Sequence, residues 1–63
     1  MTATIQFWHE SIVQKDPFTG EWEFVVEECW AGMSAPEPVV WGTMPTEEAA
    51  QAEAERITAW LDA

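Results

Sequence analysis

Residues 21–30 have the sequence EWEFVVEECW, and the predicted fold depends on this stretch. The even positions from 22 to 26 are apolar, while the odd positions carry acids at both ends of the run. Side chains of a β-strand point alternately to opposite faces, so this pattern predicts a strand with one face in the core. The expected core side chains are Trp22, Phe24 and Val26, and the expected solvent-facing ones are Glu21, Glu23 and Glu27.

A second strand and a turn are predicted before this stretch. Residues 2–14 alternate between apolar and polar side chains, and the pattern breaks at residues 9–11, where we expect a bulge or a bend. Residues 15–20 predict the turn of a hairpin, because Pro17 fixes its own φ and Gly20 permits a positive φ.

A loop, a short strand and a helix are predicted after it. Residues 31–38 are rich in Gly, Ser and Pro, and residues 39–44 form the next apolar run. Thr46 is a good N-cap for a helix that continues to about residue 61, with acids in the first turn. One face of this helix is apolar and consists of Ala50, Ala54, Ile57 and Leu61.

The order of these elements predicts an α+β fold. We expect one domain, residues 1–63, with a three-stranded antiparallel sheet and a C-terminal helix packed on one face, in the order β-β-β-α. A domain of this length has a thin core, because it buries only about 60% of its unfolded surface.

The charge of the chain is one-sided. Twelve acids stand against two bases, Lys15 and Arg56, which gives a formal charge of −10. Such a field attracts basic partners and repels nucleic acids and anionic membranes. Solubility and adaptation to high salt are two alternative reasons for this acidity.

Aromatic side chains are the other prominent feature of the composition. The chain has five tryptophans and three phenylalanines, which is more than so small a domain can enclose. We expect most of them to pack in the core and one or two to be exposed or to lie in an interface. Trp8, Trp30 and Trp41 fall outside the clean alternation or beside loops, so these are the candidates for contact with a partner.

Signatures of catalysis are missing from the sequence. It contains no phosphate-binding glycine loop, no pair of metal ligands on a helix and no nucleophile elbow. His9 and Cys29 could form a nucleophile–base pair if their strands lie side by side, but a lone strand histidine is more often structural. We therefore expect no enzyme activity, no cofactor and no bound metal.

The location of the protein is predicted from what the sequence lacks. No apolar run approaches the roughly 20 residues of a membrane span, and the first residues do not resemble a signal peptide. We expect a cytoplasmic protein, in a bacterial host if a phage encodes it, that is a monomer or a homodimer.

Two rows of acids suggest a surface that imitates DNA. Glutamates two residues apart on a strand lie about 6.8 Å apart, which is comparable to the pitch of phosphates along DNA. Acids seven residues apart line one side of the helix, about 10 Å from one another. The predicted partner-binding residues are Glu21, Glu23, Glu27, Glu28, Glu47, Glu48, Glu55, Asp62, Trp30 and Trp41.

The whole-chain profile resembles small phage-encoded anti-CRISPR proteins. The shared features are size, strong acidity, a hairpin-rich sheet with one helix, and the absence of enzyme motifs. This resemblance implies an inhibitor of a type I system that binds the basic site through which the Cascade complex recognises the protospacer-adjacent motif.

Two segments resemble the HicB antitoxin domain more weakly. These are residues 20–26, GEWEFVV, and the helix that begins TEEA at residues 46–49 and ends near Trp60 and Leu61. The proline-rich motif usual before the third strand of that family is replaced by GMSAP at residues 32–36. The resemblance implies the same fold and, as an alternative function, an antitoxin or interaction module that uses exposed tryptophans.

Overall fold

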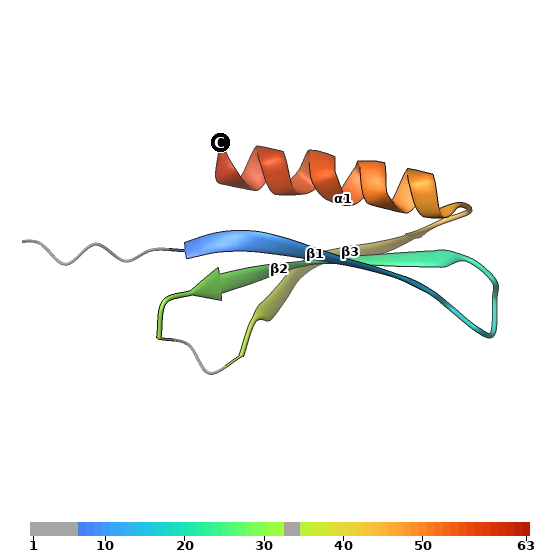
Figure 1. Ribbon diagram of the computed structural model, residues 1–63, viewed down its shortest axis with the longest axis horizontal. Helices are drawn as coiled ribbons and strands as arrows, with labels where there is room; N and C mark the ends of the chain where they lie inside the picture. Colours follow the sequence, from blue (N-terminus) through green and yellow to red (C-terminus); the bar gives the residue numbers. More distant parts are fainter. Residues whose placement is uncertain (1–6, 33–34) are drawn as a thin grey trace, which may run out of the picture.

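The computed structural model describes residues 7–32 and 35–63, which form three strands and a helix (Figure 1). The elements follow in the order β1 (Phe7–Lys15), β2 (Trp22–Trp30), β3 (Glu37–Met44) and α1 (Glu47–Asp62). The strands form one antiparallel sheet in the order β1-β2-β3, so β2 is central and the other two are edge strands. α1 lies along one face of this sheet, which confirms the predicted β-β-β-α fold.

The core lies between β2 and α1. Phe24 and Val26 are buried as their alternation predicts, and they pack against Ala50 and Ala54 of the helix. Because alanine is small, the helix can lie close to the sheet. Further apolar side chains border this cluster and are partly buried; they are Val13, Trp22, Val40, Met44, Ile57 and Leu61.

The helix does not cover the three strands equally. It packs mainly on β1 and β2 and makes few contacts with β3. On β3, Gly42 lies directly opposite Phe24, and a Cβ atom at Gly42 would lie only 3.0 Å from Cζ of that ring. The aromatic ring thus fills the space that a side chain on β3 would need.

Two predicted local signals are confirmed. In the turn between β1 and β2, a carboxylate oxygen of Asp16 accepts a hydrogen bond from the N–H of Phe18 at 2.8 Å, and Gly20 adopts a φ of 77°. At the start of α1, Oγ1 of Thr46 accepts a hydrogen bond from the N–H of Ala49 at 3.2 Å. The cap satisfies one of the N–H groups that a helix leaves unpaired at its first turn.

The predicted bulge at residues 9–11 is wrong. β1 pairs with β2 in regular register from Phe7 to Lys15, and the register shift lies instead between Val26 and Glu27, where β2 pairs with β3. The apolar pattern breaks at His9 because a polar side chain occupies a position that faces the core. β3 also begins before residue 39, at Glu37, and the predicted strand residues 2–6 lie outside the described residues.

The close approach of helix and sheet predicts a strong size limit at Ala54. Ala54 is completely buried, so we expect Ala54→Leu to lower the free energy of unfolding by about 1–3 kcal/mol through overpacking. Ala52→Leu, at an exposed position of the same helix, is the matched control and should change it by less than about 0.5 kcal/mol. Urea denaturation followed by tryptophan fluorescence measures both. Equal effects would contradict tight packing at Ala54.

Candidate partner-binding surface

The face of the sheet opposite α1 is covered by no other helix or strand of residues 7–32 and 35–63, and we call it the open face. Alternation along each strand and the pairing register decide which side chains it carries. They are Trp8, Glu10, Ile12 and Gln14 of β1, Glu23, Val25, Glu27 and Cys29 of β2, and Pro38, Trp41 and Thr43 of β3.

The register arranges these side chains in rows that run across the strands. Taken in order along the sheet, the rows are Trp8–Cys29, Glu10–Glu27–Pro38, Ile12–Val25–Trp41 and Gln14–Glu23–Thr43. An apolar row therefore lies between two rows that contain acids.

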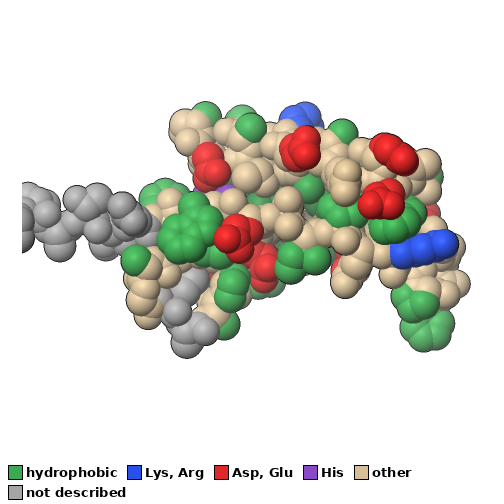
Figure 2. Space-filling model, in the orientation of Figure 1, with side chains coloured by type: hydrophobic (Ala, Val, Ile, Leu, Met, Phe, Trp, Pro, Cys, Tyr) green, Lys and Arg blue, Asp and Glu red, His purple; other side chains and the backbone are tan. Residues whose placement is uncertain are grey.

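Large apolar side chains of the open face are exposed. Trp41 is 67% exposed, Ile12 46% and Trp8 42%. Figure 2, a side view with α1 on one side of the sheet, shows hydrophobic side chains at the surface among acidic ones. Exposed apolar side chains that are grouped and bordered by polar ones are typical of interaction sites.

The charged side chains of these rows are all acidic. Glu10 and Glu27 lie directly opposite each other on adjacent strands, an arrangement of like charges that destabilises a sheet. The chain's two bases are elsewhere: Lys15 is paired with Trp22 on the helix side of the sheet, and Arg56 is in α1, bound to Glu53. A cation from another molecule would relieve this repulsion.

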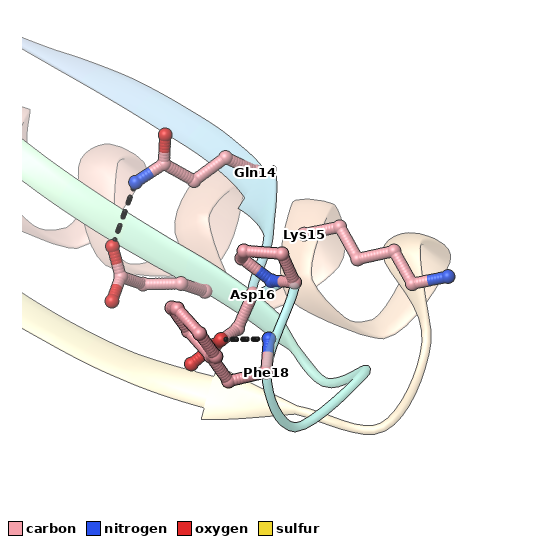
Figure 3. Close-up of a pocket in the computed structure, with 6 residues that line it drawn as sticks. Gln14, Lys15, Asp16 and Phe18 are labelled. Carbon is pink, nitrogen blue, oxygen red and sulfur yellow. Dashed lines mark hydrogen bonds between the residues drawn. The ribbon is translucent and has the colours of Figure 1, made fainter.

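Hydrogen bonds orient two of the acids. Nε1 of Trp8 donates to Glu10 at 3.1 Å, and Nε2 of Gln14 donates to Glu23 at 2.9 Å (Figure 3). Glu23 also borders two shallow hollows, one beside Trp41 and one at the turn drawn in Figure 3, where Lys15 is a lining residue as well. Phe18, at that turn, is 95% exposed, so the accessible surface continues from the rows onto the hairpin tip.

The surroundings of the cysteine on the open face disfavour its thiolate form. Cys29 is buried, and this burial raises the pKa of its thiol. The neighbouring carboxylates of Glu10 and Glu27 raise the pKa further, because they disfavour a second negative charge. The thiol is therefore protonated at neutral pH.

The predicted partner-binding residues lie on both sides of the sheet. Glu23, Glu27 and Trp41 lie on the open face, and Glu21 lies just before β2 in the turn. Three other predicted residues are exposed on α1, which covers the opposite face; they are Glu47, Glu48 and Glu55. The acids of the hairpin and those of the helix therefore do not form one continuous surface.

Asp62 is exposed, as predicted, but its carboxylate also contacts a core side chain. Its Oδ1 lies 2.5 Å from Nδ1 of His9, which is buried under the end of α1. Glu28 also faces this side, with Oε2 3.5 Å from Nε2 of His9, and it accepts a hydrogen bond from Nε1 of Trp30 at 2.6 Å. Asp62 and Glu28 thus contact a buried histidine, because the helix ends over β1.

The hypothetical nucleophile–base pair is not assembled. His9 lies opposite Glu28, on the helix side, whereas Cys29 lies opposite Trp8, on the open face. Adjacent strand positions point to opposite faces, so the imidazole and the thiol are separated by the sheet.

Sequence reasoning missed several residues of the open face, among them Glu10, Ile12 and Val25. Alternation through residues 7–15 places Glu10 and Ile12 on one side, and this signal was lost because a bulge was expected there. Val25 stands between two expected core positions, where the run of two valines hides its outward direction.

Comparisons with known proteins found no match to this chain. No protein-family model matches the chain, and neither does any curated protein or solved structure. Within residues 7–32 and 35–63, no group of ligating side chains could hold a metal ion, and no helix is long and apolar enough to cross a membrane. The anti-CRISPR and HicB resemblances stay predictions from sequence.

The contact between His9 and Asp62 predicts an unequal effect of two helix substitutions. Asp62→Ala leaves a polar atom of His9 buried without its partner, so we expect a loss of about 1–2 kcal/mol in the free energy of unfolding. Glu55→Ala, at an exposed position of the same helix, should change it by less than about 0.5 kcal/mol. If chemical denaturation gives the same small change for both, the contact does not stabilise the fold.

The raised pKa of Cys29 predicts slow thiol chemistry. We expect the folded protein to react with a disulfide reagent at neutral pH more slowly than the same protein in denaturant. Glu10→Gln removes a neighbouring charge, lowers the thiol pKa and should speed the reaction of the folded protein. Thr43→Ala, on the same face but uncharged, is the control, and stopped-flow absorbance gives the rates. A faster reaction when folded would contradict this environment.

Proposed function

We propose that this protein is a non-enzymatic inhibitor that binds the basic DNA-binding site of another protein through its open face. The observation that supports this proposal best is the combination of three carboxylates and exposed tryptophans on a face without any base. The carboxylates are those of Glu10, Glu23 and Glu27. Long-range attraction guides a basic partner, while burial of tryptophan supplies affinity.

The proposed target is a type I CRISPR–Cas Cascade complex, at the basic site that recognises the protospacer-adjacent motif. This choice follows from the profile resemblance to acidic anti-CRISPR proteins. Such a site carries lysine and arginine side chains that neutralise phosphates, and a cation-free acidic surface competes for the same side chains.

A second candidate function is an antitoxin-like or assembly module in which tryptophans dominate. The exposure of Trp41, at 67%, favours it, since tryptophan is enriched among residues that contribute most to binding. The two candidates differ in which substitution matters. Trp41→Ala should be the more harmful change for the module, whereas loss of charge should be the more harmful change for the DNA mimic.

Matched charge variants test the proposal. We expect the protein to prevent Cascade from binding target DNA in a mobility-shift assay at about 50 mM salt, and to lose this effect near 500 mM, where the Debye length is only about 4 Å. Replacing Glu10, Glu23 and Glu27 by Gln should weaken inhibition at low salt by at least about tenfold. The same replacement of Glu47, Glu48 and Glu55 removes equal charge from the helix and should change inhibition by less than about threefold.

Two results would contradict the proposal. If no inhibition occurs at low salt, Cascade is not the target. If both triple variants lose the same activity, net charge explains binding and the open face has no special part in it.

A further inference from the structure

We infer that the open face binds a basic amphipathic helix of its partner, with an apolar side chain over the central row and arginine or lysine side chains over the rows on either side. The inference rests on the proposed function, because it specifies what the basic partner presents to this face. It concerns a class of surface, so it can be tested without knowledge of the partner.

The spacing of the rows is the first argument. The apolar row of Ile12, Val25 and Trp41 lies between the Glu10–Glu27 row and the row of Glu23. Consecutive rows on one face are separated by two residues, which is about 6.8 Å along the strands. Residues four apart on a helix are separated by about 6 Å along its axis and lie on one side of it. A helix with a basic, an apolar and a basic residue at this interval matches the three rows.

The backbone supplies the second argument. A sheet face offers only side chains, so an extended segment laid across it would lose water from N–H and C=O groups without gaining partners for them. A helix pairs these groups internally and avoids this cost. The opposite face of this same sheet already accepts a helix, α1, against its central strand.

The charges supply the third argument, because the acids of the open face attract a basic occupant and repel an acidic one. Glu10 and Glu27 repel each other across adjacent strands, and no base of the chain lies beside them. A guanidinium or ammonium group between them is attracted by both carboxylates. The exposed indoles of Trp8 and Trp41 offer faces on which arginine stacks.

The same charges disfavour two other occupants. A second copy of the chain would place acids against acids, since its open face is identical and each copy carries a formal charge of −10. A nucleic acid would place phosphates against the same carboxylates. A basic helix is the occupant whose backbone, spacing and charge all suit the face.

Designed peptides test the inference with the full-length protein. The first peptide is an alanine-based helix without tryptophan, with leucine at its centre and arginines roughly four residues before and after it on one side. The second has the same composition, with each arginine moved to about two residues from the leucine, on the other side of the helix. Titration followed by the protein's own tryptophan fluorescence, at about 50 mM salt, gives the affinities.

We expect the first peptide to bind at least about tenfold more tightly than the second, since only it brings apolar and basic side chains to the face together. Replacing Glu10 and Glu23 by Gln should remove most of this difference. Replacing Glu47 and Glu55 by Gln, which removes the same charge from α1, should preserve it. A dimer formed through the open face, seen by light scattering and abolished by Trp41→Ala, would overturn the inference in favour of a second copy.

The outcomes separate this inference from the proposed function. Equal affinity for the two peptides overturns the helix-binding inference, and inhibition of DNA binding that depends on Glu10, Glu23 and Glu27 leaves the proposed function standing. Conversely, a tenfold preference for the first peptide with no inhibition of a DNA-binding complex supports the helix-binding face and contradicts the proposed function.

Discussion

The packing of Phe24 and Val26 of β2 against Ala50 and Ala54 of α1 is the contact on which the other features depend. Residues 7–32 and 35–63 contain one helix, which can cover only one face of the sheet. The alanines let the helix lie close to the sheet, and the core between them is thin. Because the helix covers one face, the side chains of the three strands that point away from it form a second face that the helix leaves uncovered, on which Cys29 is nevertheless buried.

On the uncovered surface, an apolar row of side chains lies between two rows that contain acids. Antiparallel sheets often bury one face and leave the other in water, with charged side chains on the wet face. Here the solvent-exposed face also carries Trp8, Ile12 and Trp41, and exposing their apolar surface to water is unfavourable. Acidic side chains favour solubility, and under the proposed function they also select a basic partner. Acids and tryptophans therefore lie on one face, whereas the two candidate functions predicted from sequence each rely on one of them.

The buried histidine explains why the bulge predicted in β1 is absent. His9 faces the helix and lies between Asp62 and Glu28, so a polar residue occupies a core position and the apolar alternation is interrupted. This interruption suggested a bulge, and the bulge hid the outward direction of Glu10. Asp62 and Glu28, which were both predicted to bind a partner, contact the imidazole of His9. A single polar core residue thus altered the assignment of three acids.

The sequence by itself determined the elements and their order. The alternation of residues 22–26, the Asp16–Gly20 turn and the Thr46 cap are local patterns, and each acts within a few residues, so each was predictable. Only the tertiary structure decided which acids share a surface, because that depends on pairing register and on which face the helix covers. Glu27 meets Glu10 of another strand, while Glu55 lies on the helix across the sheet. The distance along the chain between these residues predicts neither the pairing of Glu10 with Glu27 nor the position of Glu55 on the other side of the sheet.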